Sequence, residues 1–157
     1  MLFFALNVKQ PRKSATAKGY FMRIVVVSIP AQKREVPDYV KSLARGMESA
    51  GHRVDILDAW TEDGFKLPGY EYVAVCAEAT SFWGGKMPEL LPKILSAGSS
   101  LVGKKSAAFL RKTSPVSVQK ALGNLMRAME KEGMRVNWSE ILLNPAHAEA
   151  MGKRIGS

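Results

Sequence analysis

The 157-residue chain has few of the residues that mark secreted, metal-binding or membrane proteins. Its single cysteine, Cys76, allows no internal disulfide and excludes a multi-cysteine metal site, so a reducing cytoplasm is the expected location. No apolar run approaches the roughly 18 residues that a membrane-spanning helix needs. Because the chain is long enough to bury a core, we expect one globular domain without a membrane span.

Catalytic groups are also scarce. No set of nucleophile, base and orienting group can be assembled from the sequence spacing, and we interpret His52 and His147 as structural or surface residues. The chain contains neither a G-x-G-x-x-G fingerprint nor a P-loop. We therefore predict no catalytic residue and no metal ligand, so that any catalysis would come from a bound cofactor.

Acidic residues are missing from the start of the chain, although the whole chain carries a formal net charge of +9. The first acid is Glu35, and seven bases precede it: Lys9, Arg12, Lys13, Lys18, Arg23, Lys33 and Arg34. One interpretation is a basic face for an acidic protein or another anionic partner; the other, which we favour, is a solvated surface. Nucleic acid is not expected, because the bases are not interleaved with aromatic side chains.

The first 21 residues differ in pattern from the rest, so we predict an N-terminal extension over 1–21 and a folded domain over 22–157. In one account the extension is an appendage. In the other, LFFALNV is an additional strand that pairs with GYFMRIVVV across a basic turn. We favour the strand, because LFFALNV is too apolar to remain in water.

From residue 22 onward, strand patterns alternate with helical ones. Strands are predicted at 23–29, 52–58, 70–77, 103–111 and 134–143, and helices at 37–51, 88–98, 117–132 and 145–155, with a loop or very short helix at 59–69. In the longest helix, Leu125 and Met126 lie on the apolar stripe and are expected in the core. This alternation predicts a doubly wound five-stranded parallel sheet of order 2-1-3-4-5.

In such a sheet, ligands bind where the winding reverses, at the carboxyl ends of the first and third strands. The two segments there are SIPAQKREVP, residues 28–37, and AEATSFWGGKMP, residues 77–88. We therefore expect the functional residues in these two loops.

Three segments, MRIVVV, SLARGMESAGHRVDILD and YEYVAVCAEATSFWGGKMPELLPKIL, resemble the flavodoxin-like family, which includes flavodoxins and NAD(P)H-dependent FMN reductases. The likeness covers residues 22–157 and implies FMN at the switch point. Family members hold the FMN phosphate with a loop similar to Ser/Thr-x-Thr-Gly-x-Ser/Thr, but residues 30–35 have no hydroxyl and no glycine. Gln32, Lys33 and Arg34 would then hold the phosphate through their side chains; the alternative is a solvated basic loop.

The resemblance also implies that Thr80, Ser81, Phe82, Trp83 and Gly84 lie along the flavin ring, with Phe82 or Trp83 stacked on it. The alternative is an aromatic lid packed on the core. Glu78 departs from the family pattern, since it places an acid where a small residue is usual, and the loop over 111–117 lacks the glycines and second aromatic residue often found there.

Two functional hypotheses follow. The resemblance implies a flavodoxin-like redox module that binds FMN and transfers electrons between a nicotinamide or protein donor and a small acceptor. As an enzyme it would be an FMN-dependent NAD(P)H oxidoreductase. The alternative is a cofactor-free flavodoxin-fold binding module that acts through its basic surface, because fold alone does not decide function. The partners considered are accordingly FMN and NAD(P)H, an acidic protein, and a second copy of the chain as a homodimer.

Overall fold

The computed structural model describes residues 21–81, 83–97, 100–113 and 115–155, and in this part of the chain five parallel strands form one sheet. The strands are β1 (Arg23–Ile29), β2 (Arg53–Asp58), β3 (Tyr72–Ala77), β4 (Lys105–Arg111) and β5 (Arg135–Leu142). Their order is β2-β1-β3-β4-β5, and each neighbouring pair runs parallel. The predicted doubly wound topology is therefore confirmed.

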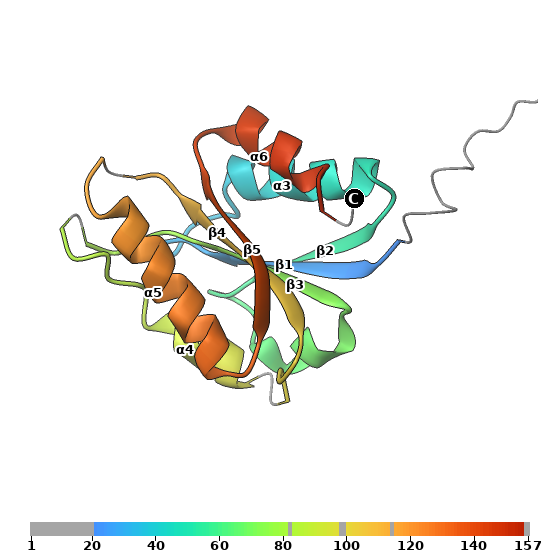
Figure 1. The fold of residues 1–157 in the computed structure, drawn as a ribbon, viewed down its shortest axis with the longest axis horizontal. Helices are drawn as coiled ribbons and strands as arrows, with labels where there is room; N and C mark the ends of the chain where they lie inside the picture. The colour runs from blue at the N-terminus through green and yellow to red at the C-terminus, as the bar shows by residue number, and fades with distance from the viewer. Residues whose placement is uncertain (1–20, 82, 98–99, 114, 156–157) are drawn as a thin grey trace, which may run out of the picture.

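Helices cover both faces of the sheet (Figure 1). On one face lie α3 (Asp38–Ser49) and α6 (Pro145–Gly152), drawn at the top of the figure. On the other lie α4 (Leu90–Ala97), α5 (Val118–Lys131) and a short 3-10 helix, η1 (Gly64–Gly69), in the segment predicted as a loop or very short helix. Each face buries its own hydrophobic cluster against the sheet.

The burial of each strand follows from its sequence. All six residues of β3 are buried, and so are the last six of β1, as expected for β-branched runs covered on both faces. Alternate residues of β1 face opposite clusters: Val25 and Val27 contribute to one, Ile24 and Val26 to the other. The prediction for α5 is confirmed for Leu125, which is fully buried, but Met126 is only partly buried.

Helices α3 and α6 cross at very close range, because glycine stands at the contact on both sides. A Cβ on Gly46 would lie 2.1 Å from the carbonyl oxygen of Glu149, and a Cβ on Gly152 would lie 2.2 Å from that of Leu43. No side chain fits between backbones at these distances. The close contact holds α6, the last helix of the described chain, against α3 on the same face of the sheet.

His52 connects the start of β1 to the residues that follow α6. Its Nδ1 accepts a hydrogen bond from the Met22 N–H at 3.1 Å, so its Nε2 carries the proton and donates to the Ile155 carbonyl oxygen at 2.8 Å. The ring is buried between these two partners. This histidine is therefore structural, as the sequence suggested.

The predicted strand LFFALNV lies outside the described residues, and Phe21 is the one member of the extension that the structure describes. The strand β1, with which LFFALNV was expected to pair, already has a neighbour on each side: β2 on one and β3 on the other. Among the described residues, β2 and β5 are the edge strands of this sheet, so a further strand would have to pair with one of these two. Within the described part of the chain, no helix combines the length and apolarity needed to cross a bilayer.

Candidate functional site

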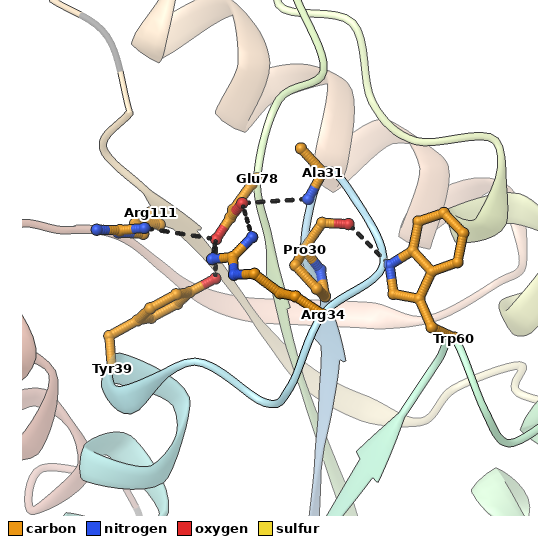
Figure 2. Close-up of polar contacts among 7 residues, drawn as sticks. All are labelled: Pro30, Ala31, Arg34, Tyr39, Trp60, Glu78 and Arg111. Atoms are coloured by element: carbon orange, nitrogen blue, oxygen red, sulfur yellow. Dashed lines mark hydrogen bonds and ion pairs between the residues drawn. The ribbon is translucent and has the colours of Figure 1, made fainter.

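The candidate site lies at the carboxyl edge of the sheet, where the loops after β1 and β3 meet. Figure 2 shows that side chains from the loop after β1, from α3, and from the ends of β3 and β4 converge there. This edge is where the winding of the sheet reverses, as the sequence predicted.

Glu78 is the residue directly after β3, and its side chain reaches into the loop after β1. Its side chain is only 4% exposed. One carboxylate oxygen, Oε1, accepts from the Ala31 backbone N–H at 3.1 Å and from Arg34 Nη1 at 3.0 Å, and the other, Oε2, accepts from Arg34 Nη2 at 2.5 Å. Tyr39, in the first turn of α3, donates its hydroxyl to Oε2 at 3.3 Å. An acidic side chain of the chain itself thus binds Arg34, one of the three residues that were predicted to hold a phosphate.

A second arginine completes this group. Arg111, the last residue of β4, places Nη1 3.7 Å from Glu78 Oε2, and its guanidinium carbon lies 5.4 Å from the centre of the Tyr39 ring. We call these four side chains, Arg34, Tyr39, Glu78 and Arg111, the Glu78 cluster (Figure 2). It joins one carboxylate to two guanidinium groups.

The electrostatics of the cluster keep Glu78 ionised. Burial by itself would raise the pKa of Glu78, but hydrogen bonds from Arg34 and the Ala31 N–H, with the charges of Arg34 and Arg111, hold it below its ordinary value. The same hydrogen bond raises the pKa of Arg34. Burial raises the pKa of the Tyr39 phenol, so Tyr39 stays protonated and donates to the carboxylate.

The three residues predicted as phosphate ligands do not act together. Arg34 belongs to the Glu78 cluster, whereas Gln32 and Lys33 are exposed and make no hydrogen bond to any other described residue. Trp60, from the segment after β2, covers the other side of this loop by donating its indole N–H to the Pro30 carbonyl oxygen at 3.0 Å.

The loop after β3 is closed on itself by the polar residues that were predicted to meet the flavin ring. Thr80 donates its backbone N–H at 2.7 Å and its hydroxyl at 3.1 Å to the Lys86 carbonyl oxygen. Ser81 Oγ accepts from the Lys86 N–H at 3.2 Å. Trp83 is 72% exposed and Gly84 is exposed beside it, while Phe82 lies outside the described residues.

The same loop is also fastened to α5. The Ser117 hydroxyl donates to the Trp83 carbonyl oxygen, and Asn124 Nδ2 donates to the Gly85 carbonyl oxygen at 2.9 Å. Gly85 has a left-handed backbone with φ of 67°, and a Cβ there would lie 2.9 Å from the Ala121 nitrogen. Between the loops after β3 and β4, a cavity of about 10 Å³ remains. That is about the minimum for a single water molecule.

The arrangement does not fit FMN in the position that the resemblance implies. At the phosphate end, the buried carboxylate of Glu78 would lie beside a second anion, and the Ala31 N–H is already engaged. At the ring end, the described residues of the loops after β3 and β4 leave a cavity of only about 10 Å³ between them. A flavin would therefore require both Glu78 and the loop after β3 to move.

Sequence reasoning identified Glu78 as a departure from the family pattern but not its partners. Arg111 carries a recognisable signal: like Glu78, it lies at the carboxyl end of an apolar strand, and neighbouring parallel strands bring such ends together. Tyr39 and Asn124 carry no comparable signal, because each lies within an ordinary amphipathic helix.

Other chemistry is limited in the described residues. Cys76 is fully buried in β3, where burial raises the pKa of its thiol and leaves it unreactive. Within the described ranges, no three His, Cys, Asp or Glu side chains are grouped closely enough to hold a metal ion.

Comparison with known proteins gives a likeness of structure. No protein-family model matches the sequence, and no curated protein matches it. A flavodoxin from the domain Archaea is similar over 86% of this chain and 96% of its own, with 18% identity and a TM-score of 0.60. Megasphaera elsdenii flavodoxin is similar over 83% and 96%, with 12% identity and a TM-score of 0.66. The flavodiiron protein from Giardia intestinalis is similar over 85% of this chain and 35% of its own, with 16% identity and a TM-score of 0.61. On this likeness and its strand order, the chain has the flavodoxin-like fold.

Proposed function

We propose that this chain is a flavodoxin-fold binding module that works without FMN and binds an anionic partner through the basic surface at its carboxyl edge. One observation supports the proposal: the Glu78 carboxylate is bound by the Ala31 N–H and both terminal nitrogens of Arg34, in the loop to which the resemblance assigned the phosphate. The single buried cysteine is consistent with action in the cytoplasm.

Competition between anions is the physical reason. A phosphate that entered the loop would meet an ionised carboxylate a few ångströms away in a poorly solvated position, where like charges repel more strongly than in water. To leave, Glu78 would have to give up four hydrogen bonds, two of them to a charged guanidinium group. The internal carboxylate therefore has a large advantage over a phosphate from solution.

The basic surface is made by side chains that surround the Glu78 cluster. Lys33 lies beside Arg34 in the loop after β1, and Lys112 lies beside Arg111 after β4; both are exposed. Lys112 and Lys120 also line one open hollow of about 570 Å³ next to the start of α5. These bases favour a negatively charged partner over a neutral one.

A flavin redox module is the second candidate, and the exposure of Trp83 favours it. A tryptophan that is 72% exposed beside Gly84 would offer a flat apolar face to a flavin ring. In this role, bound FMN would supply the electron transfer between a nicotinamide or protein donor and an acceptor. Trp83 and Gly84 would meet the ring, and Lys33 and Arg34 the phosphate, once Glu78 had withdrawn.

Titration of flavin fluorescence distinguishes the two candidates. The wild-type protein is expected to quench neither FMN nor riboflavin up to hundreds of micromolar, and to be colourless when purified. Trp83→Ala serves as the paired variant, because loss of a stacking partner weakens both flavins equally. Quenching of both by the wild type, abolished in Trp83→Ala, would overturn the proposal in favour of the redox module.

A further inference from the structure

The Glu78 cluster holds more positive than negative charge. Two guanidinium groups share one carboxylate, and among the described residues no other acid forms an ion pair with Arg34 or Arg111. Glu78 is ionised in this setting, because its pKa is lowered by the same two arginines. The cluster therefore keeps one uncompensated positive charge at the surface.

The two arginines also have unused hydrogen-bond donors, and their side chains are partly exposed. Their side chains are 39% and 45% exposed, whereas that of Glu78 is 4% exposed. Arg34 uses two of its five N–H groups on Glu78, and Arg111 donates to no acceptor among the residues described. Donors of this kind, in a planar fork, match the geometry of a carboxylate.

Both guanidinium groups have partners before any ligand arrives, Arg34 by hydrogen bonds and Arg111 by looser contacts. Arg34 is held at both terminal nitrogens by Glu78, and Arg111 lies over the ring of Tyr39 with one nitrogen 3.7 Å from the same carboxylate. Side chains already ordered in this way lose little entropy on binding, which is the usual cost of using a long arginine side chain.

We infer that Arg34 and Arg111 form a receptor for a carboxylate of an acidic protein segment, with Glu78 as the residue that positions them. This inference rests on the binding function proposed above and names its partner. A carboxylate carries a single charge and matches the one uncompensated charge of the cluster, whereas the double charge of a phosphate monoester dianion would exceed it. Lys33 and Lys112, each next to one of the arginines, provide for further acids in the same segment.

The test uses the full chain and a fluorescein-labelled, end-capped peptide of six glutamates, followed by fluorescence anisotropy. The wild type is expected to bind, more weakly as salt rises. Arg111→Ala should weaken binding at least fivefold. Lys105→Ala is the matched control: it removes an exposed base from the opposite end of the same strand, and binding should stay within twofold. Circular dichroism verifies that both variants are folded.

Glu78→Gln separates positioning from net charge. An amide offers one oxygen acceptor instead of two, so it cannot hold both nitrogens of Arg34 and also attract Arg111. Peptide binding should therefore fall, although the variant is more positive. Tighter binding by Glu78→Gln would show that charge alone matters and would overturn the positioning role.

Other outcomes overturn the inference itself. These are no binding by the wild type, equal loss in Arg111→Ala and Lys105→Ala, or equally effective competition by a ten-nucleotide oligothymidylate, which would indicate a nucleic-acid partner instead. None of them restores flavin binding, so the FMN-free function would stand. Conversely, the FMN-free part of that function is tested separately, and it fails if the flavin titration detects binding by the wild type.

Discussion

The loops after β1 and β3 are closed by different means. In the loop after β1, the closing group is a charged side chain, that of Glu78 directly after β3, which binds Arg34 and the Ala31 N–H. In the loop after β3, the closing contacts are largely to the backbone: Asn124 reaches the Gly85 carbonyl oxygen, and Gly85 lies against the nitrogen of Ala121. The first closure depends on the charge of one side chain, whereas the second depends on the shape of the main chain.

This difference predicts how each loop responds to change. A closure made by charge should be sensitive to pH and salt and should open when one carboxylate is neutralised. A closure made by backbone contact should not depend on pH or salt, and it should be disrupted most when a side chain is forced into the contact. Four substitutions test this contrast.

The largest effect is expected from Gly85→Ala. The new Cβ would lie 2.9 Å from a backbone nitrogen, and alanine is strained at a φ of 67°. We expect a loss of about 2–4 kcal/mol in the free energy of unfolding, measured by urea denaturation. Gly84→Ala is the matched control: its nearest contact is ordinary, 3.4 Å to the Ser81 hydroxyl, so its cost should be below about 0.5 kcal/mol. Equal losses would refute the backbone closure.

Arg34→Ala tests the closure made by charge. It removes two hydrogen bonds from a carboxylate that stays buried, and we expect a loss of about 1–3 kcal/mol in the free energy of unfolding. Lys33→Ala removes the same charge from the neighbouring residue, which contacts no described acid, and should cost less than about 0.5 kcal/mol. If the two variants are equally stable, the bidentate pair contributes nothing.

Glu78→Gln should change how stability depends on pH. The folded-state pKa of Glu78 lies below its ordinary value of 4.5, so the carboxylate contributes stability above that pH and loses it as the pH falls through the folded-state pKa. At pH 7 the variant should be less stable by about 1–2 kcal/mol. The gap should narrow between pH 5 and pH 3, in unfolding curves measured across about that range. A gap that stays constant down to pH 3 would show that the charge of Glu78 is not involved.

The smallest effect is expected from Asn124→Ala, which deletes a hydrogen bond to the Gly85 carbonyl oxygen. The loss should be about 0.5–1.5 kcal/mol and should not vary between pH 5 and 8, since no charge is removed. Arg127→Ala, which removes a surface donor to the same amide, is the control and should lie within about 0.5 kcal/mol of the wild type. A loss that depends on pH would contradict the proposal that this loop is closed without the help of charge.

Sequence reasoning performed best where local pattern and tertiary packing agree. The apolar runs of β1 and β3 and the 3.6-residue period of α5 each imply burial against a neighbour, and together they fix the alternating topology. Met126 is partly exposed because it lies at the edge of the apolar stripe of α5, whereas Leu125 lies at its centre. Periodicity shows which face of a helix is buried better than it shows how many residues on that face are buried.

The site was harder to predict, because its contacts join residues distant in sequence. Arg34 and Glu78 are 44 residues apart, and Tyr39 reaches the same carboxylate from a helix whose apolar face was already explained by Val40 and Leu43. From the sequence, Glu78 is a single acid near a loop where the resemblance implied a phosphate. Which of the two anions occupies the loop is a question of competition in three dimensions, on which spacing has no bearing.

The imidazole of His52 has a practical consequence for handling this protein. Because one ring bonds both the Met22 nitrogen and the Ile155 carbonyl oxygen, the two ends of the described domain are only a side chain's width apart. Both ends lie on the right in Figure 1, away from the loops that follow the strands. Residue 22 and residue 155 can therefore be joined by a short glycine linker, and a circular permutant opened elsewhere should keep the same sheet. A reporter fused at either end would likewise leave the Glu78 cluster accessible.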